Sequence, residues 1–78
     1  MIFDTIKKII IDKLNLSPDY EIEPETSLKD DLKADSVDAI EVIMELESEF
    51  GIEIDDKDLV KFETVADLEE YIENALNE

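Results

Sequence analysis

The chain has 78 residues, enough for one domain spanning residues 1–78 and too few for a deeply enclosed active site. It holds 24 acidic residues against seven lysines, with no arginine or histidine, and the net charge of −17 argues against binding to nucleic acid or anionic membranes and favours partners with basic surfaces. Without cysteine there is no disulfide, thiol nucleophile or thiolate metal site, and no apolar run approaches the roughly 20 residues that span a bilayer, so we expect a cytoplasmic protein without membrane insertion.

Residues 2 to about 15 are predicted to form a helix, because large apolar residues recur there at spacings of three and four, with lysines on the other side. A proline shortly afterwards ends the helix, since proline disfavours helical geometry in the residue before it. Residues 17–35 then form a long connection. We expect its aliphatic residues to pack on the helices and hold it in place. Within this connection, Ser27–Asp30 is typical of a single capped helical turn.

The central predicted helix spans residues 36–50 and ends at Gly51, a usual C-terminal stop. Either Asp35 or Ser36 can be its N-cap, because a short side-chain oxygen there accepts an unpaired amide of the first turn. Counted at about 100° per residue, four apolar residues fall on one broad face. They are Ile40, Ile43, Leu46 and Phe50.

Three further segments complete the chain. Residues 52–54 are an apolar connector, because a single strand would have no partner here. Residues 56–60 are predicted to form a short helix, and Thr64–Asp67 carries a capping-box pattern that opens a last helix running to about residue 76. The predicted fold class is therefore all-α, a small four-helix bundle of three longer helices and one short one, with a long first loop.

The acidic residues do not match the usual patterns of metal binding or catalysis. A calcium loop starting at Asp55 would place Lys57 and Leu59 where acidic ligands are needed, and one starting at Asp31 fails at Lys33. No histidine is available as a base, and no glycine-rich segment could cradle a phosphate. We therefore expect no metal site and no catalytic residues, and we predict that the protein is not an enzyme.

Ser36 stands at the start of the central helix with two alternative roles. It is either a simple helix cap or a hydroxyl that is modified. The neighbouring Val37 and Met44 lie at the border between the apolar face and an acidic stripe, so they are either core residues or partly exposed contacts. Composition and spacing leave both pairs of alternatives open.

The series Leu32-Lys33-Ala34-Asp35-Ser36-Val37-Asp38 is followed by Ile40-Glu41, Met44, Leu46-Glu47 and Glu49-Phe50-Gly51. This series resembles the signature of the acyl carrier protein family, in which an Asp-Ser-Leu triplet opens the second helix. The resemblance extends over the whole chain, including its length, its acidity, the long first loop and Thr64-Val65 before the last helix. The sequence departs from the family at Lys33, where glycine is common, and at Val37, where leucine is usual.

The resemblance implies that Ser36, preceded by Asp35, carries 4′-phosphopantetheine, which comes from coenzyme A and is attached through a phosphodiester. The arm ends in a thiol, which would let a chain without cysteine carry growing acyl chains as thioesters between the enzymes of fatty acid synthesis. The interior of the bundle would shelter the acyl chain. The implied lining residues are Ile40, Ile43, Leu46, Phe50, Ile54, Leu59 and Phe62.

The same resemblance implies that the protein is a monomer. Its implied partners are a phosphopantetheinyl transferase and fatty acid synthesis enzymes with basic docking patches. The implied contact residues are Asp35, Val37, Asp38, Glu41, Met44, Glu47 and Glu49. Two alternatives remain at this point. One is a specialised carrier for D-alanine or for a polyketide or peptide pathway, and the other is an acidic protein that mimics nucleic acid.

Overall fold

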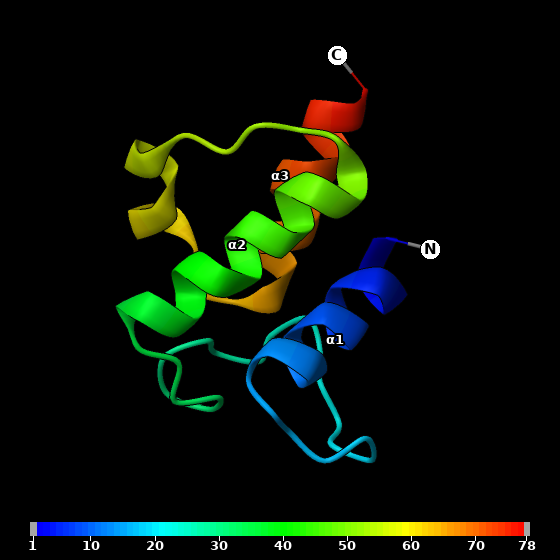
Figure 1. Ribbon diagram of the computed structural model, residues 1–78, viewed down its shortest axis with the longest axis vertical. Helices are drawn as coiled ribbons and strands as arrows, with labels where there is room; N and C mark the ends of the chain where they lie inside the picture. Colours follow the sequence, from blue (N-terminus) through cyan, green and yellow to red (C-terminus); the bar gives the residue numbers. More distant parts are fainter. Residues whose placement is uncertain (1, 78) are drawn as a thin grey trace.

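The structure is a computed structural model, and it describes residues 2–77. Three α-helices and one 3-10 helix follow one another along the chain (Figure 1): α1 is Ile2–Lys13, α2 is Ser36–Phe50, η1 is Asp56–Lys61 and α3 is Val65–Leu76. Over the described residues, β-structure is limited to one isolated bridge between Ser27 and Thr64. The predicted all-α bundle is confirmed, although α1 ends at Lys13 rather than near residue 15.

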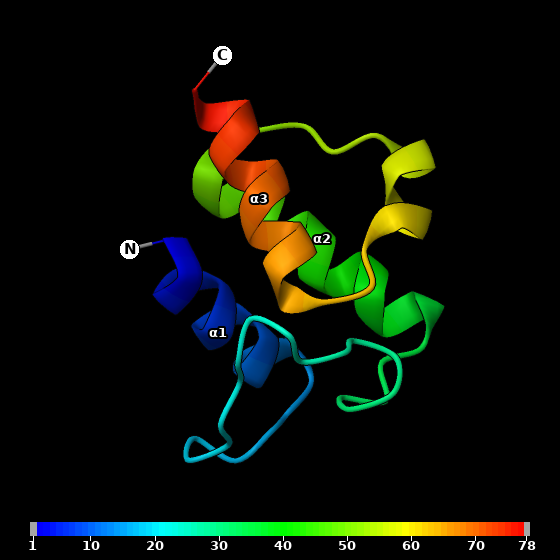
Figure 2. The ribbon, with the colours of Figure 1, turned by 180° about the vertical axis from the view of Figure 1, so that it is seen from behind.

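The core lies where α1 packs against both α2 and α3 (Figures 1 and 2). Aliphatic side chains spaced four apart turn inward and are fully buried, among them Ile6 and Ile10 of α1 and Leu68 and Ile72 of α3. Full burial of one such side chain contributes about 1.5–3 kcal/mol to folding. The same spacing that predicts the helices therefore also supplies the contacts that hold them together.

The buried face of α2 differs from the predicted one. Ile40, expected on the inner face, is 45% exposed, whereas Val42 is only 4% exposed. The apolar residues of α2 cover a wider arc than α1 and α3 can bury, so one side of that arc stays in solvent. Val37, Ile40 and Met44, at spacings of three and four, form this exposed side, which we call the apolar strip.

A residue in the left-handed backbone conformation lies near each end of α2: a glycine after the helix and a lysine before it. Gly51 follows the last turn with a φ of 65°, a left-handed conformation that glycine adopts without steric cost, and its amide donates to the carbonyl of Glu47. Lys33, in the loop before α2, has a φ of 57° and does carry a Cβ. Its side chain therefore adds strain to the turn that leads to Ser36.

The long first loop is fixed to the start of α3 rather than free. The amide of Leu28 donates to the carbonyl of Glu63 at 3.0 Å, and the amide of Val65 donates to the carbonyl of Thr26 at 3.1 Å. Two buried side chains of the loop, Ile22 and Leu32, join the core. The predicted turn at Ser27–Asp30 forms, since the Ser27 hydroxyl accepts from the Asp30 amide at 3.0 Å.

The 3-10 helix η1 lies to the side of the bundle, at the end where α2 begins (Figures 1 and 2). Asp55 is its N-cap, and its carboxylate accepts from the Lys57 amide at 3.2 Å. The following α3 opens with the predicted capping box, in which Thr64 and Asp67 each accept the other's backbone amide. None of the helices within residues 2–77 has the length and apolarity required to cross a membrane.

Candidate attachment site

Ser36 is the exposed first residue of α2, and the capping role belongs to its neighbour. The Asp35 carboxylate accepts from the Asp38 amide at 2.8 Å, while the Asp38 carboxylate accepts from the Asp35 amide at 3.4 Å. These two bonds form a complete capping box without Ser36. The alternative that sequence reasoning left open is therefore decided in favour of Asp35 as the cap, and the Ser36 hydroxyl is available for chemistry.

The backbone around Ser36 suits a bound phosphate. The first helical bond of α2 joins the Ala39 amide to the Asp35 carbonyl at 2.9 Å, so the amides of Ser36 and Val37 precede the intrahelical bonds. Such amides, together with the positive end of the helix dipole, favour an anion. A phosphodiester on Ser36 fits this helix end, although the carboxylates of Asp35 and Asp38 stand close by.

A cavity of about 260 Å³ opens beside Ser36 and leads into the bundle. Asp35, Ser36 and Lys29 stand at its polar side, and the rest of its wall is almost entirely aliphatic and aromatic. The apolar lining residues are Ile10, Leu14, Leu28, Ala34, Ala39, Val42, Ile43, Leu59, Phe62 and Leu68. Such a wall offers no hydrogen-bond partners, so it suits a hydrocarbon chain rather than a polar ligand.

Of the seven side chains expected to line an acyl pocket, Ile43, Leu59 and Phe62 do line this cavity. Leu46 and Ile54 are buried in the core away from the cavity wall, and Phe50 packs beside them. Ile40 belongs to the exposed apolar strip. Periodicity alone does not distinguish a core residue from a cavity wall, because both are buried.

Sequence reasoning missed several residues of the wall, including Ile10, Leu28 and Val42. The signal for Ile10 was present, since it lies on the predicted apolar face of the first helix. Leu28 reaches the cavity only because the first loop is bonded to the start of α3. Nothing in the local sequence predicts that long-range contact.

The outer surface of α2 combines apolar and acidic side chains. Val37 and Met44 are each 62% exposed, and together with Ile40 they form the apolar strip. Asp35, Glu41 and Glu49 are exposed and Asp38 is half-buried. This surface pairs a small apolar centre with carboxylates on the same helix.

Glu47, also expected at this surface, has a structural contact instead. One of its carboxylate oxygens accepts from the Ile54 amide at 2.8 Å in a partly buried position. This bond ties the connector after α2 back to the helix. Glu45, in turn, pairs with Lys13 of α1 at 3.5 Å.

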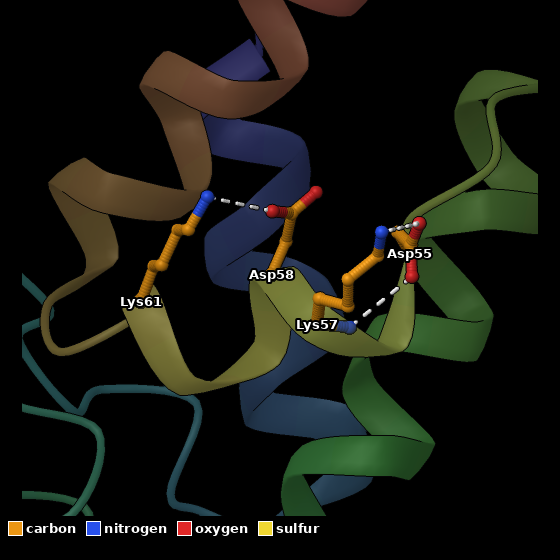
Figure 3. A network of polar contacts seen from close by, with 4 residues as sticks. All are labelled: Asp55, Lys57, Asp58 and Lys61. Carbon is orange, nitrogen blue, oxygen red and sulfur yellow. Dashed lines mark hydrogen bonds and ion pairs between the residues drawn. The ribbon is translucent and has the colours of Figure 1, made fainter.

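Beyond the cavity wall, η1 carries an ordered set of charges (Figure 3). The Lys61 ammonium lies 3.0 Å from the Asp58 carboxylate, and this contact, followed by a hydrogen bond from the Tyr71 hydroxyl, lowers the pKa of Asp58. Burial, followed by the bond to Asp58, raises the pKa of Tyr71. Lys57 lies 3.9 Å from Asp55, the N-cap of the same short helix. Of these contacts, the one between Asp58 and Tyr71 joins η1 to α3.

Acidic side chains are plentiful, but within the described part of the chain no three of them are placed to hold a metal ion together.

A small helical bundle with an exposed serine at a helix N-terminus, beside an apolar cavity, has the architecture of a carrier domain. A family model described as the phosphopantetheine attachment site matches residues 4–72. The chain is 45% identical over 75 residues to the acyl carrier protein of Thermotoga maritima, covering 96% of this chain and 91% of that protein. It is 44% identical over 72 residues to the acyl carrier protein of Wolinella succinogenes, covering 92% and 93% respectively.

The fold has a close counterpart among solved structures. The acyl carrier protein of Enterococcus faecalis, whose structure was described for its high thermal stability, superposes with a TM-score of 0.77 at 38% sequence identity. The match covers 95% of this chain and 92% of the other. The chain belongs to the acyl carrier protein family, whose cofactor is 4′-phosphopantetheine.

Proposed function

We propose that this chain carries growing acyl groups as thioesters on a 4′-phosphopantetheine arm attached to Ser36, and delivers them between the enzymes of fatty acid synthesis. One observation carries the proposal: an exposed serine that does not cap its helix lies at the mouth of an apolar cavity of about 260 Å³. The arm supplies the thiol that this cysteine-free chain lacks. Residues 1–78 act as one carrier domain that is itself not an enzyme.

In this proposal, the residues around Ser36 have different roles in holding the arm. Ser36 Oγ would hold the phosphate through an ester bond, and the amides of the first turn of α2 that precede the intrahelical bonds would be available to it as hydrogen-bond donors. Asp35 keeps the helix start in place whether or not Ser36 is modified. The aliphatic wall of the cavity excludes water from an acyl chain that folds back into the bundle.

The outer surface of α2 is the proposed docking surface. Its apolar strip of Val37, Ile40 and Met44 would bury against a partner, while nearby carboxylates would meet lysines and arginines of the partner. The proposed carboxylates are Asp35, Asp38, Glu41 and Glu49. Glu47 is left out because its carboxylate holds the Ile54 amide.

The partners in this proposal are a phosphopantetheinyl transferase and enzymes of fatty acid synthesis with basic docking patches. The charge of −17 supports fast, salt-dependent exchange between such enzymes and disfavours nucleic acid. We place the protein in the cytoplasm as a monomer. An aliphatic cavity favours a hydrocarbon cargo over a polar amino acid such as D-alanine.

The test is the intact mass of the protein after incubation with coenzyme A and a broad-specificity phosphopantetheinyl transferase. We expect the mass to rise by one phosphopantetheine in the parent protein and to stay unchanged in Ser36→Ala. Circular dichroism of both proteins verifies that they are folded. A folded parent protein that gains no mass would contradict the proposal and favour an acidic interaction protein.

A further inference from the structure

Phe62 forms part of the walls of two separate hollows. It lines the apolar cavity that opens at Ser36. It also lines a surface hollow of about 390 Å³. The remaining walls of this second hollow are Lys61, Asp67, Glu70, Tyr71 and Asn74. Phe62 is therefore the residue that the walls of the apolar cavity and of the polar surface hollow have in common.

The ring of Phe62 is held from outside. It packs edge-to-face on Tyr71 of α3, with ring centroids 5.4 Å apart and an angle of 86° between the planes. Such a pair stabilises the folded protein by more than the burial of its apolar surface, because the positive edge of one ring meets the negative face of the other. Tyr71 interacts in turn with Asp58 of η1, and Asp58 pairs with Lys61 at 3.0 Å (Figure 3). The ring of Phe62 thus packs on a residue of α3 that itself interacts with η1.

We propose that Phe62 is the stop that limits how long an acyl chain the interior cavity can shelter. This inference rests on the proposed carrier function and adds a specificity-determining residue to it. A chain that reached past the ring would enter a hollow lined mainly by charged and polar side chains, where burial of further methylenes has no benefit. With the ring removed, the cavity extends into the space beside Tyr71 and accepts more methylenes.

The experiment measures the melting temperature of the protein loaded with saturated chains from butyryl to palmitoyl. A phosphopantetheinyl transferase attaches each arm from the corresponding acyl coenzyme A, and intact mass verifies that loading is complete. In the parent protein, each added methylene that enters the cavity raises the melting temperature until the cavity is full, after which the curve is flat. In Phe62→Ala, we expect the rise to continue for at least one further two-carbon step.

The matched control is Phe3→Ala, which removes the same ring from a partly buried position that lines neither hollow. Its curve is expected to flatten at the same chain length as the parent curve. Phe62→Leu replaces the ring with a smaller apolar side chain and removes less volume than Phe62→Ala. It provides the same test if Phe62→Ala does not fold, with a smaller shift in the same direction.

Two results would overturn the inference: a folded, fully loaded Phe62 variant whose curve flattens at the parental chain length, or an equal shift in Phe3→Ala, which would indicate general loosening of the bundle. Failure of the carrier function itself is distinguishable, because the parent protein would then gain no mass at Ser36.

Discussion

Asp35 and Ser36 are adjacent residues with separate physical tasks. The Asp35 carboxylate accepts the Asp38 amide at 2.8 Å, whereas Ser36 is exposed and takes no part in the capping box. We therefore expect Asp35→Ala to lower the free energy of unfolding by about 1 kcal/mol, a typical loss for an N-cap. Ser36→Ala should change it by less than about 0.5 kcal/mol, as is usual for surface substitutions.

Urea denaturation of the unmodified protein measures both values. The parent protein and both variants should be compared at the same ionic strength, because the acidic chain responds to salt. If Ser36→Ala proved the more destabilising of the two, the assignment of the cap to Asp35 would be wrong.

Lys33 carries conformational strain three residues before Ser36, the proposed attachment residue. Its φ of 57° lies in the left-handed region, where a Cβ costs about 1–2 kcal/mol. Lys33→Gly removes this cost, partly offset by the greater backbone entropy that glycine loses on folding. We expect a net gain of up to about 1 kcal/mol, seen as a higher melting temperature.

Lys29→Gly is the matched control for this prediction. It removes the same side chain and charge from the same loop, at a residue without a positive φ. We expect this control to lower the melting temperature. Equal shifts in the two variants would show that the loss of lysine, rather than the backbone conformation, is responsible.

The element η1 depends on a carboxylate whose ionisation is coupled to folding. The Lys61 ammonium and then the Tyr71 hydroxyl lower the pKa of Asp58 in the folded protein. A lowered pKa gives stability that is present above the unfolded value, about 3.9, and is lost as the pH falls through the folded value. Asp58→Asn should therefore be less stable than the parent protein at neutral pH, with a difference that shrinks below about pH 4.

This prediction is checked by urea denaturation across a series of pH values. Asp19→Asn provides the control, because Asp19 is exposed on the first loop and has no ion pair within residues 2–77. Its stability difference from the parent should be small at every pH. A difference for Asp58→Asn that stayed constant down to strongly acidic pH would contradict the coupling.

The elements themselves could be predicted from the sequence because their signals are local. Spacings of three and four, the Thr64 capping box and Gly51 all act within a few residues. The inward face of α2 could not be predicted as well, because Ile40 and Val42 are equally apolar. Which of them is buried depends on where α1 and α3 pack. The same limit applies to the cavity wall, where Leu28 arrives through a bond between distant segments.

At the scale of the whole molecule, we expect the excess of acidic residues to influence how fast the protein associates with basic partners. A net charge of −17 would attract the proposed basic docking patch over a range that salt shortens to roughly 10 Å at 0.1 M. Glu41 is exposed beside the apolar strip, so its charge should affect the rate of association with a partner more than a single charge elsewhere on the surface does. We expect Glu41→Lys to slow phosphopantetheine loading several-fold at low salt without unfolding the protein.

Glu53→Lys distinguishes a local contact from the general field. It makes the same change in net charge at an exposed residue of the connector after α2. Loading rates from time courses of intact mass should fall much less for this variant. Equal rates for Glu41→Lys and the parent protein at low salt would contradict the assigned docking surface.

The separation of cap and attachment residue has a consequence in a mixed population of molecules. A copy that cannot be loaded, such as Ser36→Ala, keeps the cap on Asp35 and so keeps α2 with its apolar strip and carboxylates. On the proposed function, we expect such a copy to occupy the docking patch of a partner enzyme while delivering nothing. It should then act as a competitive inhibitor of the loaded protein, and its potency would report how much of the affinity for each enzyme comes from the helix alone rather than from the arm.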